Sequence, residues 1–107
     1  MILISKCLVP KGYRGMTLFP FILLKRRRFK EDMVLLNHEK IHLRQQLELL
    51  VIPFYLVYLI EFLIRYLRFN SWHLAYINIS FEREAYVNEK DLEYLKTRRF
   101  WRFTKYL

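Results

Sequence analysis

The chain has 107 residues, of which 54% are hydrophobic and 18% aromatic, and this length predicts one domain and excludes a separate substrate domain. Lys and Arg total 19 against 10 Asp and Glu, so the net charge is +9 and acidic partners are favoured: anionic lipid, nucleic acid or acidic peptide. The single cysteine, Cys7, excludes an intrachain disulfide and a thiolate metal cluster.

Residues 1–30 are predicted to form a short β-hairpin followed by a basic loop. Ile2–Val9 is rich in β-branched and apolar side chains, which is typical of a strand. Lys11–Gly15 contains both glycines of the chain and is predicted to turn. Met16–Lys25 follows as the second strand, in which Pro20 marks an edge or a bulge.

The basic run Lys25–Arg28 has two interpretations, a solvated loop or an anchor for anionic lipid or an acidic partner. Met1–Ile4 is apolar but far too short for a signal peptide, so no secretory signal is predicted. The expected localisation is cytoplasmic, with peripheral attachment to the inner face of the membrane as an alternative.

Residues 31–69 are predicted to hold two helices. Asp32 is a suitable N-cap for a helix over Met33–Val51, which Pro53 then kinks or ends. Leu49–Ile60 contains no charged residue, but this run is shorter than the roughly 20 apolar residues of a clean bilayer span. It is interpreted first as a buried core helix, with an interfacial helix and a transmembrane span as alternatives.

The first of these helices carries an HExxH sequence, in which His38 and His42 lie one turn apart on one face. Both imidazoles can therefore reach the same Zn²⁺, and Glu39 points to the side of the pair, where it can deprotonate a metal-bound water. The pattern thus predicts two of three protein ligands and the general base of a zinc enzyme. The alternative is a charged helix that carries two histidines by chance.

Residues 71–107 are predicted to hold a short helix, a glutamate-bearing helix and a tail. Ser71 is expected to cap the short helix, and Ser80 a longer one over Phe81–Leu95. The tail, Lys96–Leu107, alternates basic and aromatic residues as single-strand nucleic-acid binders do. No recognised nucleic-acid motif accompanies it, so nucleic acid is not the expected partner.

A catalytic zinc needs a third protein ligand. A third histidine in the pattern HExxHxxGxxH is excluded, because Gln45 replaces the glycine and Glu48 rotates away from the histidine pair on a continuing helix. His73 is a candidate, although a partly buried structural histidine is the simpler interpretation. Glu82 and Glu84 are candidates from a later helix, or else a solvated acidic first turn.

Two segments carry a family resemblance. The HExxH sequence continues through Gln45 and Gln46, and Phe81–Tyr86 reads FEREAY. Together they resemble the gluzincin metallopeptidases, and in particular short, uncharacterised bacterial zincin-like proteins with HExxHxxQQ and FEREAY-type motifs. The resemblance implies a zincin-like fold, and peptide or protein as the substrate. In such peptidases an edge strand beside the metal helix often pairs with the substrate backbone.

The resemblance also implies a set of site residues. His38 and His42 would be zinc ligands, Glu39 the general base and Glu82 the third ligand, with Glu84 as the alternative ligand. Tyr86 departs from the pattern, because larger gluzincins have at that position an aspartate that orients a ligand histidine.

Tyr86 is instead a candidate to hydrogen-bond a ligand or to stabilise the oxyanion, a role for which His73 and Tyr76 also compete. The predicted reaction is hydrolysis of a peptide bond by Glu39-assisted attack of a zinc-bound water. A non-catalytic protein that zinc stabilises is one alternative, and a peripheral membrane or interaction protein is another.

The sequence therefore predicts a mainly α (α+β) fold over residues 1–107, a small zincin-like helical domain with an N-terminal hairpin. Its apolar content exceeds what a small core can bury. A homo-oligomer, a membrane surface or a substrate groove is expected to cover the excess.

Overall fold

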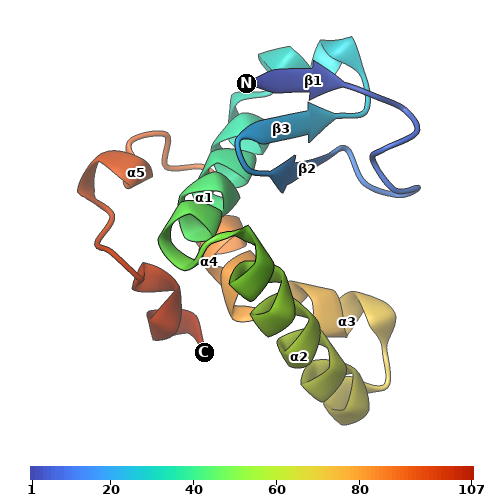
Figure 1. Cartoon of the computed structure of the whole chain (residues 1–107), viewed down its shortest axis with the longest axis vertical. Helices are drawn as coiled ribbons and strands as arrows, with labels where there is room; N and C mark the ends of the chain where they lie inside the picture. Colours follow the sequence, from blue (N-terminus) through green and yellow to red (C-terminus); the bar gives the residue numbers. More distant parts are fainter.

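A computed structural model describes residues 1–107 and confirms a mainly α (α+β) fold with a small three-stranded sheet (Figure 1). The sheet lies at one end of the molecule, and α2 runs away from it toward the other end. The elements in chain order are β1 (Ile2–Ile4), β2 (Gly15–Leu18), β3 (Phe21–Leu24), the 3₁₀ helix η1 (Arg27–Glu31), α1 (Met33–Leu49), α2 (Val51–Phe69), α3 (Trp72–Ile77), α4 (Ser80–Asn88), α5 (Tyr94–Thr97) and the 3₁₀ helix η2 (Arg102–Tyr106).

The sheet differs from the predicted hairpin. The segment expected to form the second strand turns at Pro20, because proline has no backbone N–H to donate to a neighbouring strand. The two halves of this segment pair with each other as β2 and β3. The first strand stops at Ile4, because the Ser5 hydroxyl accepts a hydrogen bond from the Leu8 amide and turns the chain. β1 then pairs in parallel with β3, so β3 is central and β2 is an edge strand.

Asp32 caps α1 as predicted, because its carboxylate accepts a hydrogen bond from the Leu35 amide. The helix ends at Leu49, and the chain bends at Leu50, which has a left-handed φ of 68°. The predicted break at Pro53 is therefore wrong. Pro53 lies in the first turn of α2, where backbone N–H groups have no acceptor within the helix, so the N–H that proline lacks is not needed.

Two apolar clusters flank the middle of α1. One lies between β3 and the first turns of α1, and the other joins α2, α4 and η2 around the stacked rings of Phe54 and Phe81. Between them, α1 buries the aliphatic side chain of Ile41 together with a series of polar side chains: Asn37, His38, Glu39, His42, Gln45 and Gln46. A helix that buries so many polar groups needs partners for all of them, and these partners define the candidate site.

The interpretation of α2 as a buried core helix is wrong. Phe54 is the buried residue of this helix, and its aliphatic side chains face outward. Glu61 and Arg65 stand four residues apart, a spacing that favours an ion pair on a helix, but they do not pair, since Glu61 accepts hydrogen bonds from the amide and hydroxyl of Ser80. By length and composition no single helix qualifies as a membrane span; α1 and α2 qualify only as a pair, bent by 111°.

The C-terminal third contains one confirmed cap and two errors. Ser71 caps α3 as predicted by accepting a hydrogen bond from the Leu74 amide. The predicted cap at Ser80 is wrong, because Ser80 is already the first residue of α4 and Ile79 holds the N-cap position without a side-chain hydrogen bond. The helix also ends at Asn88 rather than Leu95. Three backbone carbonyls at and just after its end accept hydrogen bonds from the side-chain amide of Asn37 on α1. These bonds take the place of the backbone bonds that a further helical turn would make.

Candidate metal centre

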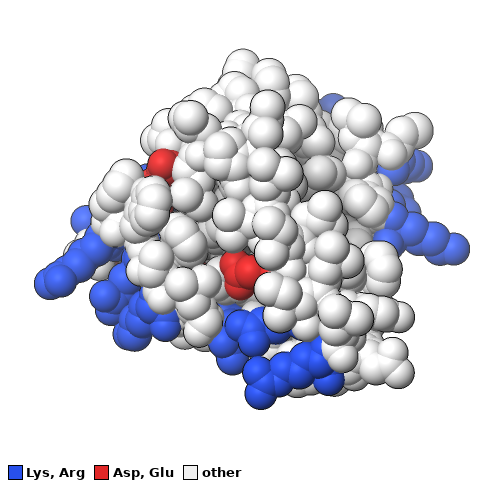
Figure 2. All heavy atoms as spheres, turned by 60° about the horizontal axis from the view of Figure 1, so that its bottom comes forward, with Lys and Arg blue, Asp and Glu red and all other residues white.

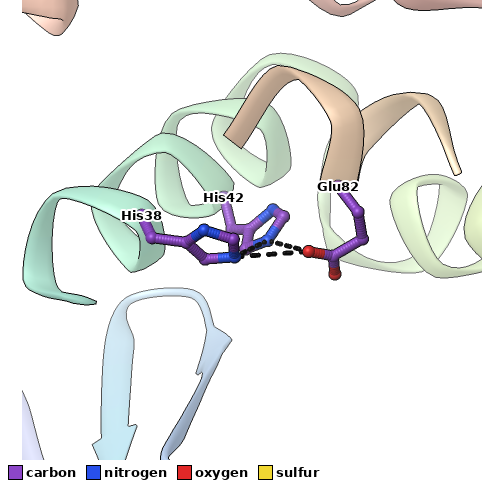
Figure 3. Close-up of side chains that lie close together, drawn as sticks. All are labelled: His38, His42 and Glu82. Carbon is purple, nitrogen blue, oxygen red and sulfur yellow. Dashed lines mark hydrogen bonds and ion pairs between the residues drawn. The ribbon is translucent and has the colours of Figure 1, made fainter. Parts of the chain in front are cut away.

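Three side chains from two helices converge in the middle of the molecule (Figure 3). His38 and His42 extend from α1, and Glu82 extends from the first turn of α4 toward both of them. Oε1 of Glu82 lies 3.0 Å from Nε2 of His42 and 3.3 Å from Nε2 of His38, and the two Nε2 atoms are 3.2 Å apart. All three residues are buried, with relative exposures of 4–6%.

The two helices approach closely at this point because small and polar residues lie between them. Ala85 on α4 is fully buried, and its methyl group is too small to hold α1 away. The amide of Gln45 on α1 donates to the Phe81 carbonyl at 3.1 Å and to the Glu84 carboxylate at 2.9 Å. The crossing therefore fixes the position of Glu82 relative to the histidine pair.

The donor set fits a small tetrahedral cation. Ligand atoms at the ordinary zinc distances of about 2.05 Å lie about 3.3 Å from one another in a tetrahedron. The measured separations of 3.0–3.3 Å are close to this value, and the three atoms face a common point. This buried group of two histidines and one glutamate can therefore hold a metal ion.

Each of the three side chains is also held by its second polar atom. Nδ1 of His38 donates to Oε1 of Glu89 at 2.8 Å, and Nδ1 of His42 donates to the side-chain oxygen Oε1 of Gln45 at 2.8 Å. The Tyr58 hydroxyl donates to Oε2 of Glu82 at 2.6 Å. Such contacts fix the tautomer of each imidazole and leave Nε2 and Oε1 for the metal.

The charges at the site support the same arrangement. Burial would lower the pKa of His42, but the Glu82 carboxylate outweighs it and raises this pKa to about 9. Burial would raise the pKa of Glu82, but the two imidazoles hold it well below its usual range. Glu82 is therefore ionised at neutral pH, as a metal ligand must be.

Glu39 lies beside the three ligands and is held by β2. The Thr17 hydroxyl lies 2.8 Å from Oε1 of Glu39, and its donation there leaves the other carboxylate oxygen without a hydrogen bond from the protein. Glycine at residue 15 avoids crowding between β2 and β3 next to this contact. A Cβ at Gly15 would lie 3.1 Å from the Leu23 carbonyl and 3.7 Å from Cγ of Glu39.

A cavity of about 500 Å³ opens onto Glu39 and the three ligands. Its wall is largely aromatic, with contributions from β2, α2 and α3 and from the loop before β2. The aromatic residues are Tyr13, Phe54, Tyr55, Tyr58, Trp72 and Tyr76. An apolar cavity with a few convergent polar groups is typical of a small-molecule or peptide site.

The other predicted site residues lie elsewhere. Glu84 is buried against Gln45, Tyr94 and Arg98, so it does not join the histidines. His73 is exposed on α3 and does not line the cavity. The Tyr86 ring packs 4.5 Å from the His38 ring, and its hydroxyl lies 3.2 Å from that of Tyr76 rather than on a ligand.

Glu89, Gln45 and Tyr58 were not predicted as partners of the ligands. Two of them carry a signal in the sequence. Gln45 follows His42 by one turn, and Glu89 follows Glu82 by two turns on the same helical face. Tyr58 carries none, since it is one of eight tyrosines and its approach depends on the bend at Leu50.

A buried ion-pair group supports α4 from behind the site. The Arg98 guanidinium bonds to Glu84 and also to both oxygens of Glu48, at 2.6 and 3.0 Å. Glu48 therefore has a structural partner, which agrees with its predicted rotation away from the histidines. The group links α1 and α4 to the segment after α5.

No protein-family model, curated protein or solved structure matches this chain. The function must therefore be argued from the residues of the site and their geometry.

Proposed function

We propose that this protein is a zinc-dependent metallopeptidase of the gluzincin type. The observation that carries the proposal is the buried triangle of two Nε2 atoms and one carboxylate oxygen, with Glu39 beside it on an open cavity. Zn²⁺ is the metal that such a nitrogen and oxygen donor set favours in hydrolases. His38, His42 and Glu82 would hold it.

When bound, Zn²⁺ would polarise a substrate carbonyl and lower the pKa of a water molecule. Glu39 is the group placed to accept the proton from that water and to deliver it to the leaving amine. Thr17 restrains one oxygen of Glu39, so the other is the proton acceptor. The aromatic wall of the cavity would keep bulk water away from this transfer.

Tyr76 is the best placed of the three predicted oxyanion donors. It lines the cavity, whereas His73 and Tyr86 do not. A hydrogen bond donated by the Tyr86 hydroxyl to that of Tyr76, 3.2 Å away, would leave the Tyr76 proton for the oxyanion. Burial, and then the charge of Glu82, raise the pKa of Tyr76, so its hydroxyl keeps its proton and can donate a hydrogen bond.

The edge strand β2 supports a peptide as the substrate. The Lys25 amide bonds to the Arg14 carbonyl, so the alternating pattern directs the backbone groups of Gly15 and Thr17 away from β3. The Thr17 carbonyl already accepts hydrogen bonds from Gln46 and Tyr55. Gly15 lines the cavity, and its backbone groups can pair with an extended peptide.

Metal analysis and peptide hydrolysis together test the proposal. Wild-type protein, purified without added zinc or a histidine tag, should contain about one zinc per chain and hydrolyse peptides from a mixed library. Glu39→Gln should keep the zinc and lose about 10²-fold or more of the turnover, as expected when a general base is removed. Glu93→Gln, a surface change of the same kind, is the matched control.

His38→Ala and Glu82→Ala should both lose zinc. Zinc retained in either variant would overturn the ligand set. Stoichiometric zinc with no hydrolysis, and a Glu39→Gln variant that behaves like wild type, would instead indicate the non-catalytic zinc protein. In that case the ion would only link α1 to α4.

A further inference from the structure

The outer face of α2 is a continuous aliphatic surface. Seven side chains recur along it at spacings of three and four residues, so they form one stripe on a 19-residue helix, and each is 52–85% exposed. We call this surface the α2 stripe: Ile52, Leu56, Leu59, Ile60, Leu63, Ile64 and Leu67. A stripe of this size on the outside of a small protein marks a contact surface.

The stripe cannot turn inward, because the opposite side of α2 is fastened along its length. Phe54 packs into the aromatic cluster with Phe81. Tyr58 bonds to Glu82, and Glu61 bonds to Ser80. These contacts begin at the first turn and continue past the middle of the helix, so the stripe needs a partner from outside the chain.

The charges around the stripe are basic. α2 contains three charged residues. Glu61 accepts hydrogen bonds from Ser80, and the other two, Arg65 and Arg68, lie in the last turns. The chain as a whole carries a net charge of +9. On the face drawn in Figure 2, Lys and Arg gather along the margins around a broad area that is mostly uncharged.

An aromatic group closes the C-terminal end of the stripe. Trp72 is 66% exposed, and its ring packs against Phe62 and Tyr66 on α2, with centroid separations of 4.8 and 6.3 Å. Tryptophan and tyrosine beside arginine are typical of segments that lie at the boundary between lipid headgroups and acyl chains.

We propose that α2 docks through this stripe onto a lipid surface that contains anionic headgroups. A second copy of the chain is the less favourable occupant, because pairing would bring two molecules of charge +9 together, whereas anionic headgroups neutralise that charge. The run Arg26–Arg28 is not part of the surface. It follows β3 at the sheet end of the molecule, away from the C-terminal end of α2 (Figure 1).

Vesicle flotation tests this proposal with the full chain. The probes are phosphatidylcholine vesicles and vesicles with phosphatidylcholine and phosphatidylglycerol at about three to one, a composition that gives a strongly anionic surface. Wild-type protein should float with the anionic vesicles, and less so as salt is added. Leu59→Gln/Leu63→Gln should weaken the binding by about tenfold or more, since two inserted aliphatic side chains are lost.

The matched control is Leu92→Gln/Leu107→Gln, which makes the same change at two exposed leucines outside α2 and should bind like wild type. Arg65→Gln/Arg68→Gln should weaken binding to the anionic vesicles alone. Far-UV circular dichroism and zinc content, both expected to be unchanged, show that the variants fold.

Three results would overturn the proposal. The first is wild-type protein that does not float with anionic vesicles. The second is equal binding by the stripe variant and its control. The third is a lipid-free dimer in sedimentation that Leu59→Gln/Leu63→Gln dissociates without changing vesicle binding, because the stripe would then be the contact between two copies.

Discussion

The hydrogen bond from Tyr58 to Glu82 gives a sharp test of how the metal centre is held. Tyr58→Phe removes one hydroxyl and keeps the ring that packs beside Phe54. The bond is short at 2.6 Å, and its acceptor is a buried carboxylate oxygen. Hydrogen bonds to charged groups contribute about 1.5–3 kcal/mol, and about 1.4 kcal/mol corresponds to a factor of ten in affinity.

Loss of this bond leaves Oε2 of Glu82 without a donor from the protein and allows the carboxylate to rotate away from the histidines. We therefore expect Tyr58→Phe to bind zinc about 10- to 100-fold more weakly than wild type, the usual effect of removing a group that orients a ligand. Competition with a chromophoric chelator at fixed pH measures this ratio. Circular dichroism in excess zinc should show unchanged helical content.

Tyr66→Phe is the matched control, since it removes from the same helix a hydroxyl that makes no hydrogen bond, on an exposed ring that stacks on Phe62. It should bind zinc like wild type. Wild-type affinity in Tyr58→Phe would refute the reasoning, and so would an equal loss in Tyr66→Phe, because the effect would then come from α2 as a whole.

Two further predictions concern the support and the protonation of the site. Arg98→Met should destabilise the fold by about 3–5 kcal/mol in a urea titration, because it leaves two buried glutamates without their cation, whereas Arg99→Met at an exposed position should change little. An unchanged midpoint in Arg98→Met would contradict this. Zinc binding should strengthen by about tenfold per pH unit between pH 7 and 9 and then level off, because the Glu82 carboxylate raises the pKa of His42 to about 9 and zinc must displace that proton. Calorimetry in two buffers of different ionisation enthalpy measures the number of protons released when zinc binds. A zinc affinity that does not change between pH 7 and 9 would contradict the displacement of a proton from His42.

Local rules accounted for much of what the sequence predicted correctly. Asp32 and Ser71 cap their helices, because a cap depends on the next three residues alone. The spacing of His38 and His42 places them on one face for the same reason. The choice of Glu82 over Glu84 as a zinc ligand came from the resemblance. In the structure Glu82 lies beside the two histidines, whereas α4 turns Glu84 toward Gln45 and Arg98.

Two of the errors share a cause, which is that their determinants lie far away in the sequence. The glutamate helix stops at Asn88 because Asn37, 51 residues earlier, takes the carbonyl groups at its end. Glu61 turns to Ser80 rather than to Arg65 because α4 begins beside α2. No local pattern contains either contact.

Hydropathy also could not distinguish a buried α2 from an exposed one. Its apolar residues cover most of the helix circumference, and only the packing shows that aromatic side chains fill the inner face while aliphatic ones remain outside. This division has a physical basis. The hydroxyls of Tyr55 and Tyr58 each donate to a buried acceptor, and an aliphatic side chain in place of Tyr58 would leave Oε2 of Glu82 without a donor.

The same helix therefore connects the two proposals. On its inner face, Tyr58 donates a hydrogen bond to Glu82, and Tyr55 donates one to Thr17 on the edge strand β2. Its outer face carries the α2 stripe. Trp72 belongs both to the aromatic end of the stripe and to the wall of the cavity. If α2 docks on lipid, Trp72 would bring one edge of the cavity close to the bilayer surface and to a peptide bound there. Addition of anionic vesicles should then raise the hydrolysis rate for membrane-bound peptides more than for soluble ones. An equal effect on both would separate lipid docking from substrate choice.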